Sequence, residues 1–207
     1  MSNTETIRVY SDYVCPFCYL GRRSLERYRQ RRADPLAVDW HPFDLRARKR
    51  GPDGEIDHAV DDGKDEDYYE QARANVRRLQ ERYDVEMTLG IATDIDSLPA
   101  QVASHYVKEE HRDAWEDFDE AVFDAIWQDG ADIGDADLLA GLAGDVGLDG
   151  AAIRTAVADD RRRERVSELF EAARRQGITG VPTFVYGDHA ARGAVPPEQL
   201  ERLVEGT

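Results

Sequence analysis

The chain has 207 residues, of which 41% are hydrophobic, so it can form the core of one domain or of one domain with a large insertion. Its formal net charge is −16, and the lysines among its 27 basic residues are Lys49, Lys64 and Lys108. Because a nucleic-acid duplex would repel so acidic a chain, we expect no nucleic-acid partner. High salt screens the self-repulsion of an acidic, lysine-poor surface, so we expect a halophilic protein, with an ordinary acidic surface as the alternative.

The N-terminal residues give an expectation about location. Met1–Thr6 lack the basic region and apolar run of a signal peptide, and the chain has no run of about 18 apolar residues. We therefore expect a cytoplasmic protein with no membrane partner. A reducing cytosol disfavours structural disulfides, so the cysteines are expected to be reactive.

The first part of the chain has the pattern of a strand, a helix and a second strand. A strand is predicted over Ile7–Ser11, a helix over Cys18–Arg32 and a strand over Leu36–Trp40. If the two strands are parallel, a right-handed crossover joins them. The charged, turn-rich segment Arg46–Asp67 predicts an exposed loop.

Helical periodicity dominates from about Tyr68 to Gln176. Asp135 and Asp149 stand where helix N-caps are expected. Four apolar stripes at helical spacing are expected to be core and to carry no chemistry. They are Tyr69, Ala72, Val76, Leu79 and Tyr83; Trp115, Phe118, Val122 and Ile126; Leu138, Leu139, Leu142 and Val146; and Val166, Leu169, Phe170 and Ala173.

Strand character returns near the C-terminus. A strand is predicted over Thr183–Tyr186, a hairpin turn over residues 187–189 and a short strand over Ala190–Ala194. Pro197 then opens a last helix, Glu198–Val204, because proline is favoured at the first helical position.

This order of elements predicts an α/β fold, in which a thioredoxin-like sheet is formed by a β-α-β half and a β-β-α half. A large all-helical insertion separates the two halves. We divide the chain into residues 1–45 for the N-terminal half, 46–176 for the loop and helical insertion, and 177–207 for the C-terminal half.

The two cysteines of the chain lie in the sequence Cys15-Pro16-Phe17-Cys18, between a predicted strand and a predicted helix. A cytosolic C-x-x-C at such a junction is typical of a thioredoxin-like redox site. The unsatisfied N–H groups at the helix start can stabilise a thiolate, so Cys15 is the predicted nucleophile. Cys18, about one turn inside and less exposed, is the predicted resolving thiol. Pro16 is tolerated in the first turn, and Phe17 offers the sulfur no polar group.

Four further residues are candidates for the site. Val181-Pro182 lies directly before a predicted strand, where the residues alone leave both a trans and a cis peptide bond open. Asp12 could relay a proton or cap the turn at the strand end. His41 could lie at the rim of the site or be a hydrogen-bonded structural histidine. The histidines form no ligand pattern with the cysteines, and C-x-x-C supplies only half of a zinc site, so we expect no metal.

The chain resembles the DsbA-like thioredoxin superfamily and, within it, the cytoplasmic FrnE-type branch. The matching segments follow one another along nearly the whole chain and are Asp12–Gly21, Trp40–Leu45, Asp132–Asp135, Gly177–Phe184 and Arg192–Pro196. The resemblance implies a thioredoxin fold with a helical insertion and a cis proline, Pro182, facing the cysteine pair. It also implies that the Val181 backbone pairs with an extended substrate segment beside Cys15.

Other members of the branch resemble kappa-class glutathione transferases and 2-hydroxychromene-2-carboxylate isomerases. They carry serine at the position of Cys15 and lack the second thiol. Because this chain keeps both thiols, the resemblance favours dithiol redox chemistry.

We therefore expect a thiol–disulfide oxidoreductase that acts on protein or low-molecular-weight thiols and disulfides. Its redox centre would be the Cys15–Cys18 pair, and no other cofactor is expected. One alternative is a glutathione-dependent isomerase or transferase that uses Cys15 alone. The others are a non-catalytic, redox-switched binding or chaperone module and a metal cluster shared across a dimer interface. The helical insertion could also support a homodimer.

Overall fold

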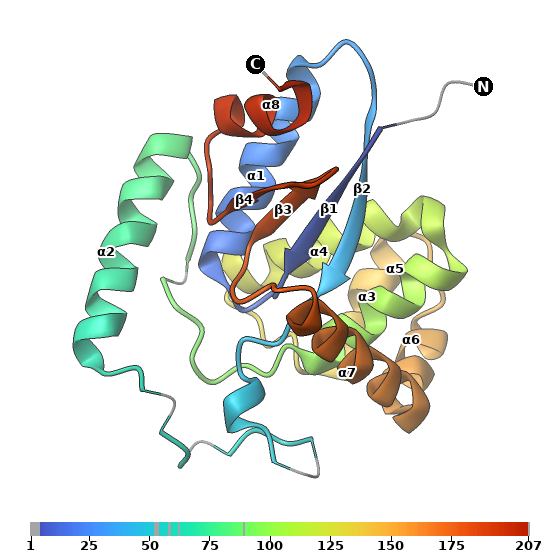
Figure 1. Ribbon diagram of the computed structural model, residues 1–207. Coiled ribbons are helices and arrows are strands. Elements are labelled where there is room, and N and C mark those ends of the chain that lie inside the picture. The colour runs from blue at the N-terminus through green and yellow to red at the C-terminus, as the bar shows by residue number, and fades with distance from the viewer. Residues whose placement is uncertain (1–4, 52–53, 58, 62, 89, 207) are drawn as a thin grey trace.

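A four-stranded mixed sheet forms the centre of the molecule (Figure 1). The structure is a computed structural model that describes residues 5–51, 54–57, 59–61, 63–88 and 90–206. The strands are β1 (Glu5–Ser11), β2 (Leu36–Pro42), β3 (Thr183–Tyr186) and β4 (His189–Arg192), and their order in the sheet is β2-β1-β3-β4. β1 pairs in parallel with β2 and antiparallel with β3, and β4 pairs antiparallel with β3.

The two faces of the sheet are covered by different helices. On one face, α1 (Pro16–Arg31) and α8 (Pro197–Glu205) pack over alternate residues of β1, where Ile7 and Val9 meet Leu25 and Leu200. On the other face, Tyr10 packs against residues at the end of α7 (Asp160–Arg175) and in the segment that follows it. The N-terminal half and the C-terminal half therefore share one sheet and one pair of covering helices.

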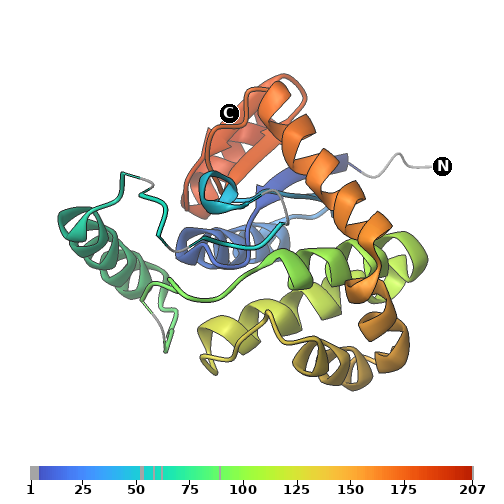
Figure 2. The ribbon, with the colours of Figure 1, turned by 90° about the horizontal axis from the view of Figure 1, so that it is seen from below.

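The helices between β2 and β3 lie on both sides of α1 (Figure 2). One side carries α3 (Leu98–Glu110), α4 (Trp115–Trp127), α5 (Ala136–Asp145) and α6 (Gly150–Ala158), with the 3-10 turn η2 (Arg112–Ala114) before α4. α2 (Glu66–Tyr83) lies on the other side, where Tyr83 donates a hydrogen bond to the Ala194 carbonyl at 2.7 Å. The largest apolar cluster joins the α3–α6 group to residues around the two cysteines.

The predicted α/β fold with a thioredoxin-like sheet and a helical insertion is confirmed by this arrangement. The boundaries at residues 45/46 and 176/177 stay predictions. The N-caps at Asp135 and Asp149 are confirmed, since their side chains accept hydrogen bonds from Asp137 N at 2.8 Å and Ala151 N at 2.9 Å. None of the described helices is long and apolar enough to cross a membrane.

The segment predicted as an exposed loop is partly ordered by ion pairs. It contains the 3-10 turn η1 (Ala47–Lys49) and a β-bridge between Arg50 and Ile56. The Arg50 guanidinium is mostly buried and pairs with Asp44 at 3.0 Å and with Asp96 at 3.0 Å. Both aspartates lie outside the segment Arg46–Asp67, so the composition of the segment alone does not reveal these ion pairs. Residues 52, 53, 58 and 62 of this segment lie outside the described residues.

Several element boundaries differ from the predictions by a few residues. α1 begins at Pro16 rather than Cys18, because proline takes the first helical position and Cys15 is the N-cap. β4 begins at His189, which pairs with Tyr186, so the turn is shorter than predicted. It ends at Arg192, before the left-handed Gly193 (φ +84°).

Candidate functional site

The two cysteines lie at the start of α1, where β1 delivers the chain to the helix. Cys15 is the N-cap residue in extended conformation, and its carbonyl accepts hydrogen bonds from Cys18 N at 3.0 Å and Tyr19 N at 3.3 Å. Cys18 is therefore in the first turn of the helix, as its spacing predicts. Both residues are free thiols.

Cys15 faces the segment that precedes β3. Its Sγ lies 3.6 Å from the Val181 carbonyl oxygen, to which the thiol can donate a hydrogen bond. The Val181–Pro182 peptide bond is cis, as the resemblance implies. Gly21 in α1 permits this close approach, because a Cβ there would stand 3.0 Å from Pro182 Cγ and 3.1 Å from Phe184 Cζ. The structure thus brings Cys15, Val181 and Pro182 together from opposite ends of the chain.

The two thiols differ little in exposure but face different cavities. Cys15 is 3% exposed and Cys18 is 2% exposed, so the predicted contrast in exposure is small. Cys15 lines a cleft of about 160 Å³, whereas Cys18 lines a separate cavity between α1 and α4. Burial, together with the neighbouring Cys15, raises the pKa of the Cys18 thiol well above its usual range.

The near wall of the Cys15 cleft is the active-site turn itself. Pro16 and Phe17, both predicted as accessory residues, line it together with Val14 and Val181. Pro16 is buried and Phe17 is half-buried. These residues surround the Cys15 thiol with apolar surface on the side of the cleft nearest to the sulfur.

The far wall of this cleft was not predicted. It consists of cationic and aromatic side chains from the segment after β2 and from α2, namely Arg46, Lys49, Lys64, Tyr68 and Tyr69. Tyr69 and Ala72 were expected in a core stripe, but both line the cleft, and the described part of α2 buries Val76 and Tyr83. A sequence signal was present, since two of the three lysines lie in this one segment.

One cleft residue carries a polar atom that points to a ligand. Arg46 Nη2 donates to the Ala92 carbonyl, while Arg46 Nη1 is buried and has no hydrogen-bond partner among the described residues. A buried guanidinium nitrogen without a partner is costly. Among the described residues that line the cleft, none is acidic. The cleft therefore offers a site for a negatively charged group.

Asp12 lies beneath the active-site turn and is fully buried. Its Oδ1 accepts a hydrogen bond from Val14 N at 3.3 Å, and its Oδ2 accepts one from Leu45 N at 2.9 Å. Burial and the nearby Asp44 charge raise the pKa of Asp12 from 3.8 to about 6. Asp12 thus ties the turn before Cys15 to the segment after β2, which agrees with its interpretation as a turn-capping residue.

His41 does not lie in either cavity wall. Its ring stacks on Tyr10 with centroids 4.9 Å apart, and its Nε2 lies 2.9 Å from Asp39 Oδ2. Asp39 in turn accepts a hydrogen bond from Lys108 Nζ at 2.7 Å. The structure therefore separates His41 from Cys15 and gives it the partners of a structural histidine. In the described part of the chain, no group of three His, Cys, Asp or Glu side chains is arranged to hold a metal ion.

Two known proteins are similar to this chain in sequence. The chain is 32% identical over 206 residues to the uncharacterized protein YwbO of Bacillus subtilis (strain 168), covering 97% of this chain and 96% of YwbO. It is 26% identical over 187 residues to the 2-hydroxychromene-2-carboxylate isomerase of Sphingobium xenophagum, covering 89% and 90% of the two chains.

A solved structure shows the same fold at lower sequence identity. The crystal structure of a probable DsbA oxidoreductase from Streptomyces coelicolor superposes with a TM-score of 0.74 at 21% identity, covering 97% of this chain and 88% of that one. Residues 6–205 match the family described as the DSBA-like thioredoxin domain. With this match over nearly the whole length, a mixed sheet and a cis proline beside the first cysteine, the chain belongs to the DSBA-like thioredoxin family.

Proposed function

We propose that the protein is a thiol–disulfide oxidoreductase in which Cys15 is the nucleophile and Cys18 the resolving thiol. The observation that carries this proposal is the position of Cys15 Sγ, 3.6 Å from the Val181 carbonyl and at the wall of a cleft. Cys18 follows one helical turn later, within reach of a sulfur bound at Cys15. Membership in the family of DSBA-like thioredoxin domains supports the same chemistry.

The reaction has two exchange steps. The Cys15 thiolate attacks a disulfide R–S–S–R, a Cys15–S–R bond forms, and R–S⁻ leaves with the electron pair and takes up a proton. Cys18 then loses its proton and attacks Cys15 Sγ, so that the Cys15–Cys18 disulfide forms and the second R–S⁻ leaves. The two cysteines are oxidised by two electrons and the substrate becomes two thiols. The reverse sequence oxidises a dithiol substrate.

Serine variants of the two cysteines test this assignment. Cys15→Ser should abolish exchange with a model disulfide, whereas Cys18→Ser should accumulate a mixed disulfide on Cys15 that mass spectrometry detects. The matched comparison is valid because both substitutions replace a buried thiol of the same helix start. Full exchange activity in Cys15→Ser would overturn the proposal.

The direction of the reaction follows from the reduction potential of the pair. Equilibration against a thiol buffer, with trapping of free thiols, measures it. A value near about −270 mV is that of thioredoxin and would support a reductase, while a value near about −120 mV is that of DsbA and would support an oxidant. In either case the dithiol itself is the proposed redox centre, with no other cofactor.

The charge of the cleft favours an anionic substrate. Arg46, Lys49 and Lys64 line it in a chain whose net charge is −16, and Arg46 Nη1 has no partner among the described residues. A guanidinium binds carboxylates, like phosphates, through charge-assisted and often bidentate hydrogen bonds. We therefore propose low-molecular-weight or peptide disulfides that carry carboxylates, rather than neutral ones, as the preferred substrates.

A second candidate is a glutathione-dependent isomerase or transferase that uses Cys15 alone. The observation that favours it is the similarity to the 2-hydroxychromene-2-carboxylate isomerase over 89% of this chain. Isomerase or transferase activity that survives Cys18→Ser would support this candidate, since the resolving thiol takes no part in it.

The setting of the protein is also a proposal. We propose that the protein is FrnE-type and cytoplasmic. We also propose that it is adapted to high salt, because salt screens the self-repulsion of a chain with a net charge of −16. The helical insertion could support a homodimer. Unfolding measured in low salt and in molar KCl tests the adaptation to salt. Equal stability in the two conditions would contradict it.

A further inference from the structure

A second cavity reaches the resolving thiol from the side opposite to the substrate cleft. It has a volume of about 390 Å³ and lies between α1 and α4. Its floor is one face of the sheet, formed by alternate residues of β1 and β2, and Cys18 lies in its wall. Cys15 lines the cleft on the other side, so the two thiols have different surroundings.

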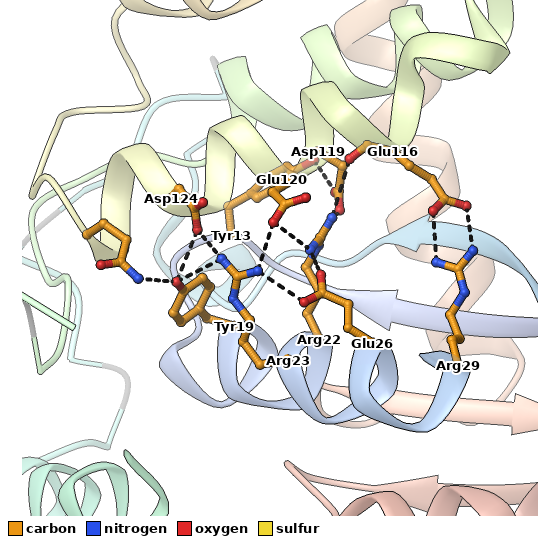
Figure 3. Close-up of polar contacts among 11 residues, drawn as sticks. Tyr13, Tyr19, Arg22, Arg23, Glu26, Arg29, Glu116, Asp119, Glu120 and Asp124 are labelled. Carbon is orange, nitrogen blue, oxygen red and sulfur yellow. Dashed lines mark hydrogen bonds and ion pairs between the residues drawn. The ribbon is translucent and has the colours of Figure 1, made fainter. Parts of the chain in front are cut away.

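Ion pairs between α1 and α4 bridge the cavity (Figure 3). Arg22 Nε lies 2.9 Å from Asp119 Oδ2, Arg23 Nη1 lies 2.8 Å from Glu120 Oε1, and Arg29 Nη1 lies 2.8 Å from Glu116 Oε2. All six of these residues line the cavity and make its outer part strongly polar. Such a polar opening admits water.

The network is anchored to the active-site turn. Asp119 is buried and also accepts a hydrogen bond from the Tyr13 hydroxyl at 2.8 Å, and the Tyr13 carbonyl accepts one from Trp127 Nε1 at 2.9 Å. Tyr13 stands two residues before Cys15. The cavity therefore has a fixed position relative to the cysteine pair.

The inner end of the cavity contains a donor without a partner. Trp40 is buried and lines the cavity, and its Nε1 has no hydrogen-bond partner among the described residues. The neighbouring Trp115 differs, because its Nε1 donates to Ser104 Oγ at 3.0 Å. A buried indole N–H requires an acceptor, and the cavity has room for several waters of about 30 Å³ each.

Ser11 lies at the same end of the cavity. It is buried at the end of β1 and lines the cavity together with Cys18 and Trp40. Its hydroxyl is a hydrogen-bonding neighbour of the Cys18 sulfur and, with the backbone N–H of Asp12, opposes the rise in the pKa of Cys18. A hydroxyl that contacts both a thiol and water can accept one proton while it donates another.

The proposed resolving step needs a route for the Cys18 proton. While a substrate is bound to Cys15 it occupies the cleft, so a proton leaving on that side would have to pass the substrate. We propose that the Ser11 hydroxyl, with water held by Trp40 Nε1 in the α1–α4 cavity, relays the Cys18 proton to solvent during resolution.

This inference rests on the proposed dithiol function. In the step, the Cys18 S–H proton passes to Ser11 Oγ as the Ser11 O–H proton passes to water. The Cys18 electron pair then forms the bond to Cys15 Sγ, and R–S⁻ leaves from Cys15.

Stopped-flow reaction with 5,5′-dithiobis(2-nitrobenzoate) tests the relay in the intact protein. A first thionitrobenzoate is released when Cys15 attacks, at a rate that depends on reagent concentration, and a second is released when Cys18 resolves the mixed disulfide. Ser11→Ala should slow the second phase at least about tenfold and leave the first unchanged, since a proton relay contributes by general acid–base catalysis. The solvent deuterium isotope effect on the rate of the second phase should also differ between Ser11→Ala and the wild-type protein.

Matched variants separate the relay from a packing role. Ser11→Thr keeps the hydroxyl and should restore the second phase. Ser24→Ala removes another buried serine hydroxyl, one that donates to the Val195 carbonyl at 2.6 Å, and should alter neither phase. Trp40→Phe removes the indole N–H but keeps an aromatic ring, and should slow the second phase, which provides the test if Ser11→Ala fails to fold.

The outcomes distinguish the relay from the function on which it rests. If the wild-type protein released a single thionitrobenzoate, with no second phase, the dithiol function itself would be refuted. If the wild-type protein showed both phases and Ser11→Ala resolved at the wild-type rate, the relay alone would fail. Failure of Ser11→Thr to restore the second phase would likewise overturn the relay in favour of packing.

Discussion

The buried carboxyl of Asp12 makes the stability of this protein depend on pH in a direction that the structure determines. Its Oδ2 accepts a hydrogen bond from Leu45 N at 2.9 Å, and the side chain is fully buried close to the charge of Asp44. Asp12→Asn keeps the shape and one acceptor oxygen but removes the ionisation. The amide nitrogen cannot accept the hydrogen bonds of the oxygen that it replaces, but this loss does not vary with pH. The pH dependence of the difference between the two proteins therefore isolates the cost of charging the site.

The size of the effect follows from the pKa of Asp12, which rises from 3.8 to about 6 on folding. A shift of about two pKa units corresponds to about 3 kcal/mol. Because the folded protein binds this proton more tightly than the unfolded chain, the stabilisation is complete below about pH 4 and is lost as the pH rises through 6. The free energy of unfolding of Asp12→Asn, relative to wild type, should thus increase by about 3 kcal/mol between pH 4 and pH 7.

Urea unfolding of the two proteins at constant high ionic strength, over this pH range, measures the difference. Other titrating groups are common to both proteins and cancel in the comparison. Asp44→Asn removes the second cause of the raised pKa, so in that background the pH window should move to lower values. A wild-type-to-variant difference that stayed flat from pH 4 to pH 7 would refute the argument.

Two further predictions concern the surroundings of Cys15. Gly21→Ala should lower the free energy of unfolding by about 1–3 kcal/mol, because its Cβ would meet Pro182 Cγ at 3.0 Å. Gly141→Ala in α5 is the control, since a Cβ there would meet no other heavy atom of the described residues within 4 Å. It should raise the free energy of unfolding by up to about 1 kcal/mol. Urea unfolding of the two variants distinguishes the close contact at Gly21 from helix propensity. Equal changes in the free energy of unfolding would contradict the close contact. Replacing Lys49 and Lys64 by Gln should raise KM for glutathione disulfide several-fold and leave KM for the neutral hydroxyethyl disulfide unchanged. An equal rise in KM for both disulfides would contradict recognition of the substrate by its charge.

The features that were predictable from the sequence are those with local causes. The C-x-x-C at the junction of β1 and α1 follows from two cysteines placed between a strand pattern and a helix pattern. Asp135 and Asp149 cap their helices because a short acceptor side chain before an apolar periodic run suits that position. The sheet halves were likewise apparent, because their strands carry the apolar residues of the core.

The walls of the two cavities could not be predicted in this way. The far wall of the Cys15 cleft comes from a segment held by Arg50 to Asp44 and Asp96, and the latter is 46 residues away. Tyr69 shows helical spacing like a core residue, yet it lines the cleft beside Cys15. Contacts of this kind depend on tertiary placement, which neither periodicity nor composition records.

The position of α1 between two cavities explains how one short motif can carry two different steps. The first step requires that a substrate sulfur reach Cys15, and the cationic cleft with the Val181 carbonyl lies on that side. The second requires that Cys18 lose a proton while the substrate still covers Cys15, and the α1–α4 cavity lies behind Cys18. Since the two requirements are met by residues on opposite sides of the same helix, substitutions in the two walls should affect different phases of a single turnover. A variant of the cleft wall that slowed only the resolving phase would show that the two sides are not separated as this geometry implies.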